Sequence, residues 1–373
     1  MGSPESCIRS VRILLFDPKY RKISQQVNAE FHNPKKDSPL KGSSRTSRAV
    51  RQKIVTIGGG SGQYALLSGL RDIASISVTA VVSMMDSGGS TGRLRDELGT
   101  LPPGDVLKCV LALSPHQEAM RSLLQKRFQK DRRLRGHNAG NMLLTMLSQY
   151  TGSFPSGVNA LAEILDVRGA ILPVTTDRAT LVAELTDGTR IYGEGAIDMP
   201  RGHQREKIKD VFLVPHHSDQ IKVYPPVIEA IQAADHVVLG PGDLFTSIIP
   251  NLVVPSVSEA LQQTGAKLTY VVNVMTKFGE TQNFQCADFV RKLEPFIGRP
   301  VDAVIYNTAR PDQALADLYA LQKSEFVEID MQDALWRQRR LHAQDLLESS
   351  SRIIRHDPKK IAAVLEAIFV EDP

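Results

Sequence analysis

The pattern of apolar and polar positions first becomes regular near residue 53. Residues 54–57 are a short β-branched run, which predicts a buried strand. Five residues rich in glycine follow at 58–62, and apolar residues then recur at helical spacing over 65–70. A second apolar run at 76–84 predicts another strand. This order of strand, glycine-rich turn, helix and strand is typical of the opening of a doubly wound α/β fold.

Strands and helices continue to alternate along the chain. Helices are predicted at 105–113, 118–128, 138–149 and 358–369, and strands followed by helices at 236–239, 268–274 and 303–306. Residues 169–224 differ, because alternating Thr, Val and Ile around an Asp-Gly turn predict a small β-rich insertion. We therefore expect an α/β chain with a Rossmann-like, doubly wound, mainly parallel sheet and a small β-rich insertion. Residues 53–373 are expected to form this single nucleotide-binding domain.

Residues 1–52 lack this pattern. They hold 11 Lys or Arg against 4 Asp or Glu and few aromatic residues, so they bury too little apolar surface to offset the entropy of ordering. We interpret them as a disordered basic tail, and the alternative is an arm that contacts RNA or a membrane. The remaining residues have a net charge of −3, which gives no strong case for nucleic acid as the main ligand.

Cysteine usage and hydropathy indicate the cytoplasm. The three cysteines, Cys7, Cys109 and Cys286, are far apart and not in CxxC spacing, which is typical of a reducing compartment. No apolar run reaches the ~18 residues that a membrane span needs. We predict a cytoplasmic protein without a membrane partner. Its oligomeric state stays open, and a homo-oligomer is one possibility.

The glycine-rich turn after the first strand is the first candidate for ligand binding. Backbone N–H groups at a helix start are unpaired donors at the positive end of the helix dipole, and glycine lets a phosphate approach them. Residues 60–65 match G-x-G-x-x-A, a dinucleotide fingerprint, although a tight turn alone can also require glycine. No P-loop lysine follows, which argues against ordinary ATPase chemistry. The candidate ligand contacts are Gly58, Gly59, Gly60, Ser61 and Gly62.

A second polar loop follows the second strand. Asp86 could hold ribose hydroxyls, bind Mg²⁺ or accept a proton, and the alternative is a simple turn-forming role. Arg93 could pair with a phosphate or lie in solvent. The glycines and hydroxyls between them are typical of an anion-binding loop. The candidate ligand contacts are Ser87, Gly88, Gly89, Ser90, Thr91 and Arg93, and Asp86 is a candidate catalytic and Mg²⁺-binding residue if the protein is a transferase.

A third loop of this kind follows the predicted strand at 236–239. Because the carboxyl ends of parallel strands meet at one edge of a sheet, three such loops are expected to lie together and to bind one phosphorylated ligand. The candidate contacts from this loop are Gly240, Gly242, Asp243, Thr246, Ser247 and Asn251.

Two further segments carry amide side chains near predicted element ends. Asn138 and Asn141 share a helix face, so both amides could meet one ligand, although Asn138 could equally be a helix N-cap. Asn273 and Thr276 follow the strand at 268–274 and could contact a base or a sugar. Lys277, beside them, is predicted to lie in solvent.

These segments resemble the YvcK/CofD-like family, which comprises gluconeogenesis factors and relatives of 2-phospho-L-lactate transferase. The resemblance rests on five stretches in family order: IVTIGGGSG from Ile54, DSGGSTGRLRDELGTLPPGD from Asp86, GHNAGN from Gly136, GPGDLFTSIIPNL from Gly240 and NVMTKFGET from Asn273. It covers nearly all of residues 53–373 and leaves residues 1–52 outside.

The resemblance implies a Rossmann-like fold and a phosphorylated ligand. Its transferase branch moves phospholactate from a guanosine diphosphate donor to a deazaflavin alcohol with Mg²⁺. Its gluconeogenesis-factor branch is similar to binders of UDP-N-acetylglucosamine and is associated with cell shape and gluconeogenic growth. Tyr319 and Arg355 match positions where those binders carry a Tyr and an Arg. Many relatives have two adjacent acids where this chain has Asp86 and Ser87, which puts transfer in doubt but not binding.

Three functions follow from these features. The first is a regulatory protein that binds a phosphorylated nucleotide or nucleotide sugar. The second is a Mg²⁺-dependent transferase in which Asp86 binds the metal or acts as base and Arg93 stabilises phosphoryl charge. The third, an NAD-dependent dehydrogenase, rests only on the fingerprint at Gly60 and on Asp86. We expect the regulatory binding protein, without turnover, for two reasons. Residue 87 is a serine where many relatives have a second acid, and aromatic residues, which a deazaflavin pocket would need, are only 6% of the chain.

Overall fold

The main sheet has seven strands and is fully parallel, and its central strands are short runs rich in buried apolar residues. The computed structural model describes residues 51–130, 134–200, 202, 204–217, 219–349 and 352–371. In spatial order the strands are β3 (Ala170–Pro173), β2 (Ile76–Val82), β1 (Gln52–Gly58), β7 (His236–Leu239), β8 (Lys267–Val271), β9 (Ala303–Asn307) and β10 (Arg340–Gln344). All residues of β7 and β9 are buried, as a sheet with helices on both faces requires.

Amphipathic helices cover the sheet in two groups. In one group α3 contacts both α5 and α15, and in the other α12 contacts both α10 and α13. The helices are α3 (Gly60–Leu70), α4 (Gly89–Leu98), α5 (Gly104–Leu113), α6 (Gln117–Leu124), α7 (Ala139–Thr151), α8 (Phe154–Ile164), α10 (Pro225–Gln232), α11 (Ile249–Leu252), α12 (Val257–Gln263), α13 (Cys286–Ile297), α14 (Gln313–Ala320) and α15 (Pro358–Glu371). A π-helical turn, η1 (Leu244–Ile248), precedes α11, and a 3₁₀ turn, η2 (Ala334–Gln338), precedes β10.

The order of the strands places the loops after β1 and β7 at a topological switch point. The chain builds outward from β1 to β2 and β3, and then returns to β7 on the other side of β1. Helices that connect neighbouring strands leave in opposite directions from such a point, so a crevice opens beyond the strand ends. Ligands of doubly wound proteins bind in this crevice. The predicted Rossmann-like fold is confirmed.

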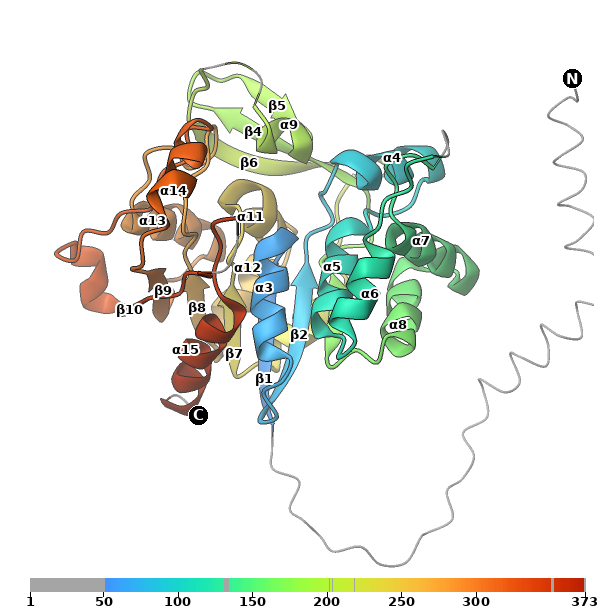
Figure 1. Cartoon of the computed structure of the whole chain (residues 1–373), viewed down its shortest axis with the longest axis horizontal. Coiled ribbons are helices and arrows are strands. Elements are labelled where there is room, and N and C mark those ends of the chain that lie inside the picture. The colour runs from blue at the N-terminus through green and yellow to red at the C-terminus, as the bar shows by residue number, and fades with distance from the viewer. Residues whose placement is uncertain are drawn as a thin grey trace, which may run out of the picture. The chain divides into compact units, whose positions relative to one another are not determined.

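A small antiparallel sheet interrupts the main fold. Its strands are β4 (Ala179–Leu185), β5 (Arg190–Tyr192) and β6 (Ile208–Pro215), in the order β5-β4-β6, and a short helix, α9 (Glu194–Asp198), lies between β5 and β6. Figure 1 shows this sheet above the end of the main sheet at which α3 begins. The β-rich insertion was predicted over 169–224, but its first strand, β3, pairs with β2 in the main sheet.

Several predicted boundaries shift by a few residues. The first strand begins at Gln52, so the ordered chain reaches into the last residues of the predicted tail. The rest of that tail, residues 1–50, lies outside the described residues, and its predicted disorder stays a prediction.

Among the residues that the structure describes, no single helix is long and apolar enough to cross a membrane. One bent pair, Leu244–Leu252 with Val257–Gln263, meets that length and composition test.

Candidate functional site

The loop after β1 presents helix-start amides that no side chain caps. Gly59, the N-cap of α3, has extended backbone and makes no side-chain cap hydrogen bond. Gly60 has φ +67°, a left-handed conformation that favours glycine. Within the described part of the chain, the N-cap residue thus supplies no side-chain cap to the N–H groups that open this 11-residue helix. This is the arrangement that binds phosphate at helix starts.

The loops after β1, β7 and β8 interlock. A Cβ on Gly62 would lie 2.2 Å from the carbonyl oxygen of Pro241, so two backbones touch where only glycine fits. The buried Asn251 amide donates to the carbonyl oxygens of Gly58 at 3.2 Å and Ser247 at 2.8 Å. The Gly242 N–H donates to the Asn273 side-chain oxygen at 3.0 Å. These contacts fix the relative position of the three loops.

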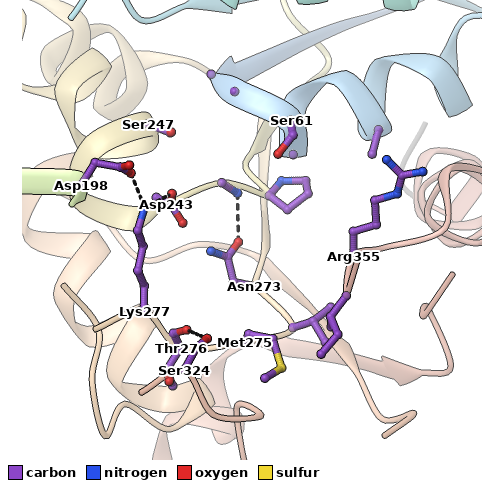
Figure 2. Close-up of a pocket in the computed structure, with 18 of the residues that line it drawn as sticks. Ser61, Asp198, Asp243, Ser247, Asn273, Met275, Thr276, Lys277, Ser324 and Arg355 are labelled. Carbon is purple, nitrogen blue, oxygen red and sulfur yellow. Dashed lines mark hydrogen bonds and ion pairs between the residues drawn. The ribbon is translucent and has the colours of Figure 1, made fainter. Parts of the chain in front are cut away.

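A cavity of about 620 Å³ opens beside these loops. Figure 2 shows Ser61, Ser247, Asn273 and Arg355 around it. Twelve of the predicted site residues line the cavity, and they are Gly59, Gly60, Ser61, Gly62, Asp86, Gly242, Asp243, Ser247, Asn273, Thr276, Tyr319 and Arg355. The structure thus brings together candidates from four loops and from the last third of the chain.

The other predicted residues do not line this cavity. Gly58 and Gly240 lie at the ends of β1 and β7, and Asn251 holds these loops together. Thr246 donates its hydroxyl to the buried Glu280 carboxylate. The remaining ones all belong to α4 with its preceding loop or to the start of α7, and they are Ser87, Gly88, Gly89, Ser90, Thr91, Arg93, Asn138 and Asn141.

The loop from Asp86 to Thr91 is used largely for internal contacts. The Gly88 N–H donates to Asp86 at 2.8 Å, which forms a tight turn. Ser90 is buried, and its hydroxyl lies 2.9 Å from Nδ1 of His137 at the start of α7. Arg93 is exposed and donates to the Arg135 carbonyl oxygen at 2.8 Å. The predicted contact between Arg93 and a phosphate has no support in this geometry.

The two asparagines of α7 have structural contacts. Asn138 is the N-cap of α7, because its side-chain oxygen accepts the Asn141 N–H at 2.7 Å. The amide of Asn141 points to the Ser90 hydroxyl at 3.5 Å. The sequence allowed Asn138 to be either a helix N-cap or a ligand contact, and in the structure it is the N-cap of α7.

Acidic side chains form the first wall of the cavity. Asp86 and Asp105 approach the site from the start of α4 and α5, and Glu194 reaches it from α9. Burial, and then the charge of Asp105, raise the pKa of Asp86. Burial, and then the charge of Asp86, raise the pKa of Glu194 to about 7. Lys108 pairs with Asp105 at 2.9 Å and also feels the charge of Asp86.

A second charged group lines the opposite part of the cavity. The Lys277 ammonium contacts Asp198 from α9, Asp243 at 2.6 Å and Glu280 at 3.4 Å. Figure 2 shows Lys277 reaching between Asp198 and Asp243. Burial works to lower the pKa of Lys277, but the three carboxylates raise it. Lys277 was expected in solvent, and this expectation was wrong because its partner Asp198 comes from the distant insertion.

The far end of the cavity is formed by the C-terminal third of the chain. The Tyr319 hydroxyl accepts the Ile354 N–H at 3.1 Å, and Arg355 pairs with Glu348. His356 also lines the cavity, and burial lowers its pKa to about 4, so its imidazole is neutral. Tyr319 and Arg355 therefore face the same cavity as the glycine loops, although more than 250 residues separate them in sequence.

Sequence reasoning missed several lining residues: Asp105, Lys108, Glu194, Asp198, Gln322, Ser324 and His356. The sequence did contain a sign that Asp105 belongs to the site, because Asp105 is the last residue of the long family-like stretch that begins at Asp86. Glu194 and Asp198 carried none, since nothing in the local pattern of the insertion indicates which of its acids face the main domain.

The acidic walls bear on the predicted Mg²⁺. Asp198, Asp243 and Glu280 offer oxygens within 4.8 Å of one another, but the Lys277 ammonium already lies among them, which disfavours a cation there. Asp86 lies beside Asp105 and Glu194, and carboxylate oxygens are the ligands that Mg²⁺ prefers. The acids near Asp86 are of this type but are not gathered around one point: among the described residues, only Asp198, Asp243 and Glu280 bring three acidic side-chain oxygens within 4.8 Å of one another.

Comparison with known proteins identifies the family. The family model for 2-phospho-L-lactate transferase CofD matches residues 54–347. The chain belongs to this family. It is 36% identical to the gluconeogenesis factor of Bacillus subtilis over 86% of this chain and 99% of that protein. It is 38% identical to the gluconeogenesis factor of Halalkalibacterium halodurans over 75% of this chain and 85% of that protein.

A solved family member has the same fold. The crystal structure of a UPF0052 family protein from Bacillus halodurans superposes with a TM-score of 0.78 at 34% identity, and it covers 85% of this chain and 99% of that one. The resemblance inferred from five short stretches is thus confirmed over most of the chain.

Proposed function

We propose that the protein binds a nucleotide joined through a diphosphate to a neutral sugar, of the UDP-N-acetylglucosamine type, as a regulatory protein without turnover. The observation that carries this proposal is the charge of the cavity wall. Among the described residues, five carboxylates line the cavity, from Asp86, Asp105, Glu194, Asp198 and Asp243. The three cationic side chains that line it, Lys108, Lys277 and Arg355, are each in an ion pair with a carboxylate.

Such a wall favours hydroxyl groups over further anions. Carboxylates accept hydrogen bonds from sugar hydroxyls, and these charge-assisted bonds are about twice as strong as neutral ones. A ligand group with its own carboxylate, such as lactate, would instead be repelled by the five acids. The diphosphate is assigned to the start of α3, beside Ser61 and Gly62, in the same cavity.

The far end of the cavity is suited to the nucleoside. Tyr319 offers a ring for contact with a base, and Asn273 and Thr276 add polar groups to the lining of the same cavity. An aromatic ring gains about 1–3 kcal/mol from stacking on a base. The proposal thus assigns the base to Tyr319, the diphosphate to the start of α3 and the sugar to the acidic wall.

A role in gluconeogenic growth is part of the proposal. It is supported by the name gluconeogenesis factor, which relatives at 36–38% identity carry. A link to cell shape and a cytoplasmic location rest on the sequence resemblance and on cysteine usage alone.

The alternative is a Mg²⁺-dependent transferase of the phospholactate type. The observation in its favour is that Asp105 and Glu194 line the same cavity as Asp86, so further acids are present although residue 87 is a serine. Bound Mg²⁺ would neutralise phosphate charge, and Asp86 would orient or deprotonate the attacking alcohol. One observation argues against the transferase. Arg93, which was expected to stabilise negative charge on the phosphoryl group, lies outside the cavity.

Calorimetric titration separates these proposals. Purified protein is titrated with UDP-N-acetylglucosamine, GDP and NAD⁺, each with and without Mg²⁺. We expect the nucleotide sugar to bind most tightly. Tight binding of NAD⁺ alone would reject both proposals and favour a dehydrogenase.

Turnover is tested separately by mass spectrometry. The protein is incubated with Mg²⁺, a guanosine diphosphate-lactate donor and the deazaflavin alcohol. We expect no transferred product. Several turnovers per protein, abolished in Asp86→Ala, would establish the transferase instead.

A further inference from the structure

Helix α9 forms one wall of the cavity without belonging to the main fold. It supplies Glu194 and Asp198 to the lining, and Met199 and Pro200 follow directly after it. It has only five residues, and an isolated helix of that length is not stable in water. Its place against the cavity must therefore come from contacts with the rest of the protein.

The loop after β2 holds the first end of α9. The Ser87 hydroxyl accepts the Gly195 N–H at 2.9 Å, and the Ser87 N–H donates to Glu194 at 3.1 Å. This pair of contacts aligns the start of the helix with the wall formed by Asp86. Ser87 itself does not line the cavity, so its contact with α9 is a positioning contact.

Lys277 holds the other end. Its ammonium bonds Asp198, the last residue of α9, and Asp243, which precedes η1 beside the glycine loops. Glu280 lies 3.4 Å away and is fully buried. The ion pairs thus connect three segments: the insertion, the loop after β7 and the loop after β8. The side chain of Lys277 is 27% exposed, so these ion pairs are partly shielded from water and salt.

We propose that Lys277 is a positioning residue that joins Asp198 to Asp243 and so holds α9 across the cavity, where Glu194 meets the sugar of the ligand. This inference rests on the proposed function and names the residue that sets its selectivity. The glycine loops bind the diphosphate whether or not α9 is in place. The sugar is recognised only when α9 is held against it.

The inference predicts a loss that depends on the ligand. Lys277→Met should weaken binding of UDP-N-acetylglucosamine about tenfold and leave UDP within about twofold of the native protein. Lys277→Arg should restore most of the affinity, because guanidinium can also join two carboxylates. Lys292→Met is the matched control, since Lys292 also connects the insertion to the main domain, through the Lys209 carbonyl oxygen, but does not line the cavity.

A double substitution separates positioning from direct contact. If Lys277 acts through Asp198, then Lys277→Met combined with Asp198→Asn should be no weaker than the worse single variant. Losses that add would mean that each side chain contacts the ligand independently, which overturns the inference. Equal losses for UDP and the nucleotide sugar would overturn it too, because Lys277 would then act on the phosphates.

Hydrogen exchange in the ligand-free protein gives a readout that does not depend on binding. Lys277→Met should speed the exchange of backbone amides within 194–198 by about tenfold, and Lys292→Met should not. Unchanged exchange would reject the positioning role even if the nucleotide sugar binds. A different result would reject the proposed function instead. In that case the native protein binds neither UDP nor UDP-N-acetylglucosamine, while Lys277→Met still exchanges faster. Lys277 would then position α9 without a role in sugar recognition.

Discussion

At the scale of single residues, Gly62 shows how two backbones create the site. The fingerprint predicted it as a phosphate contact, and the structure adds that it touches the carbonyl of Pro241. A side chain at this position would collide with main-chain atoms that cannot rotate away. Glycine is therefore needed here for the packing of the two loops.

Gly62→Ala is expected to destabilise the protein by about 1–3 kcal/mol, because the new methyl group overfills a packed contact. Gly265→Ala is the control, since a Cβ there would meet nothing within 4 Å. Urea unfolding of both variants measures the difference. Equal stability of the two variants would mean that the loops after β1 and β7 can separate at little cost.

Glu194 makes stability depend on pH. Burial and the charge of Asp86 raise its pKa from 4.5 to about 7 in the folded protein. The folded state therefore holds a proton that the unfolded state has lost between about pH 4.5 and 7. Because the folded state binds more protons in this range, the contribution of Glu194 to stability falls as the pH rises from about 4.5 to about 7 and changes little above that.

Glu194→Gln should remove this dependence, because the amide is neutral and can still accept the Ser87 N–H. We expect the melting temperature of the native protein to fall relative to that of the variant between pH 5 and pH 8. Glu163→Gln, at an exposed position in α8, is the control. A constant difference between native protein and Glu194→Gln across this range would contradict the raised pKa.

At the scale of elements, the start of α7 distinguishes capping from ligand contact. The Asn138 side chain accepts a helix-start N–H, and the Asn138–Asn141 pair lies outside the cavity. N-caps of this kind contribute about 1 kcal/mol. The polar groups of GHNAGN thus join α7 to α4 rather than reach the glycine loops.

Asn138→Ala should lower the free energy of unfolding by about 1 kcal/mol and leave nucleotide-sugar affinity unchanged. Asn138→Ser should keep most of the stability, because serine also caps helices. Chemical denaturation and calorimetry test the two parts. A tenfold loss of affinity without a loss of stability would return Asn138 to the list of ligand contacts.

Elements with strong local patterns were predicted, and those without were not. The β-branched run of β1 and the helical spacing of α5 and α15 are present in the structure near the predicted residues. Strand β10 was missed, because its residues are exposed or half-buried at the edge of the sheet and carry little apolar alternation. Strand β3 was assigned to the insertion, since only its pairing with β2 reveals which sheet it joins.

At the scale of the whole molecule, the composition of residues 1–50 leads to a simple expectation. The segment has few residues that could pack against a core, and the described domain begins its first strand at Gln52. Deletion of residues 1–50 should leave the melting temperature and the nucleotide-sugar affinity nearly unchanged. Calorimetry on the truncated and full-length proteins checks both. A marked loss in either would mean that the segment contributes to the domain or to its site.

The sequence by itself determined the fold class and the place of the site. Local periodicity predicts strands and helices, and parallel strands require their carboxyl ends, with the glycine loops, to share one edge. Only the tertiary structure decided which polar side chains face the cavity. Asp86 lines it while Ser87 turns to α9, and Lys277 is paired because Asp198 arrives from the insertion. The direction of a loop side chain depends on partners that are distant in sequence, and no local pattern records them.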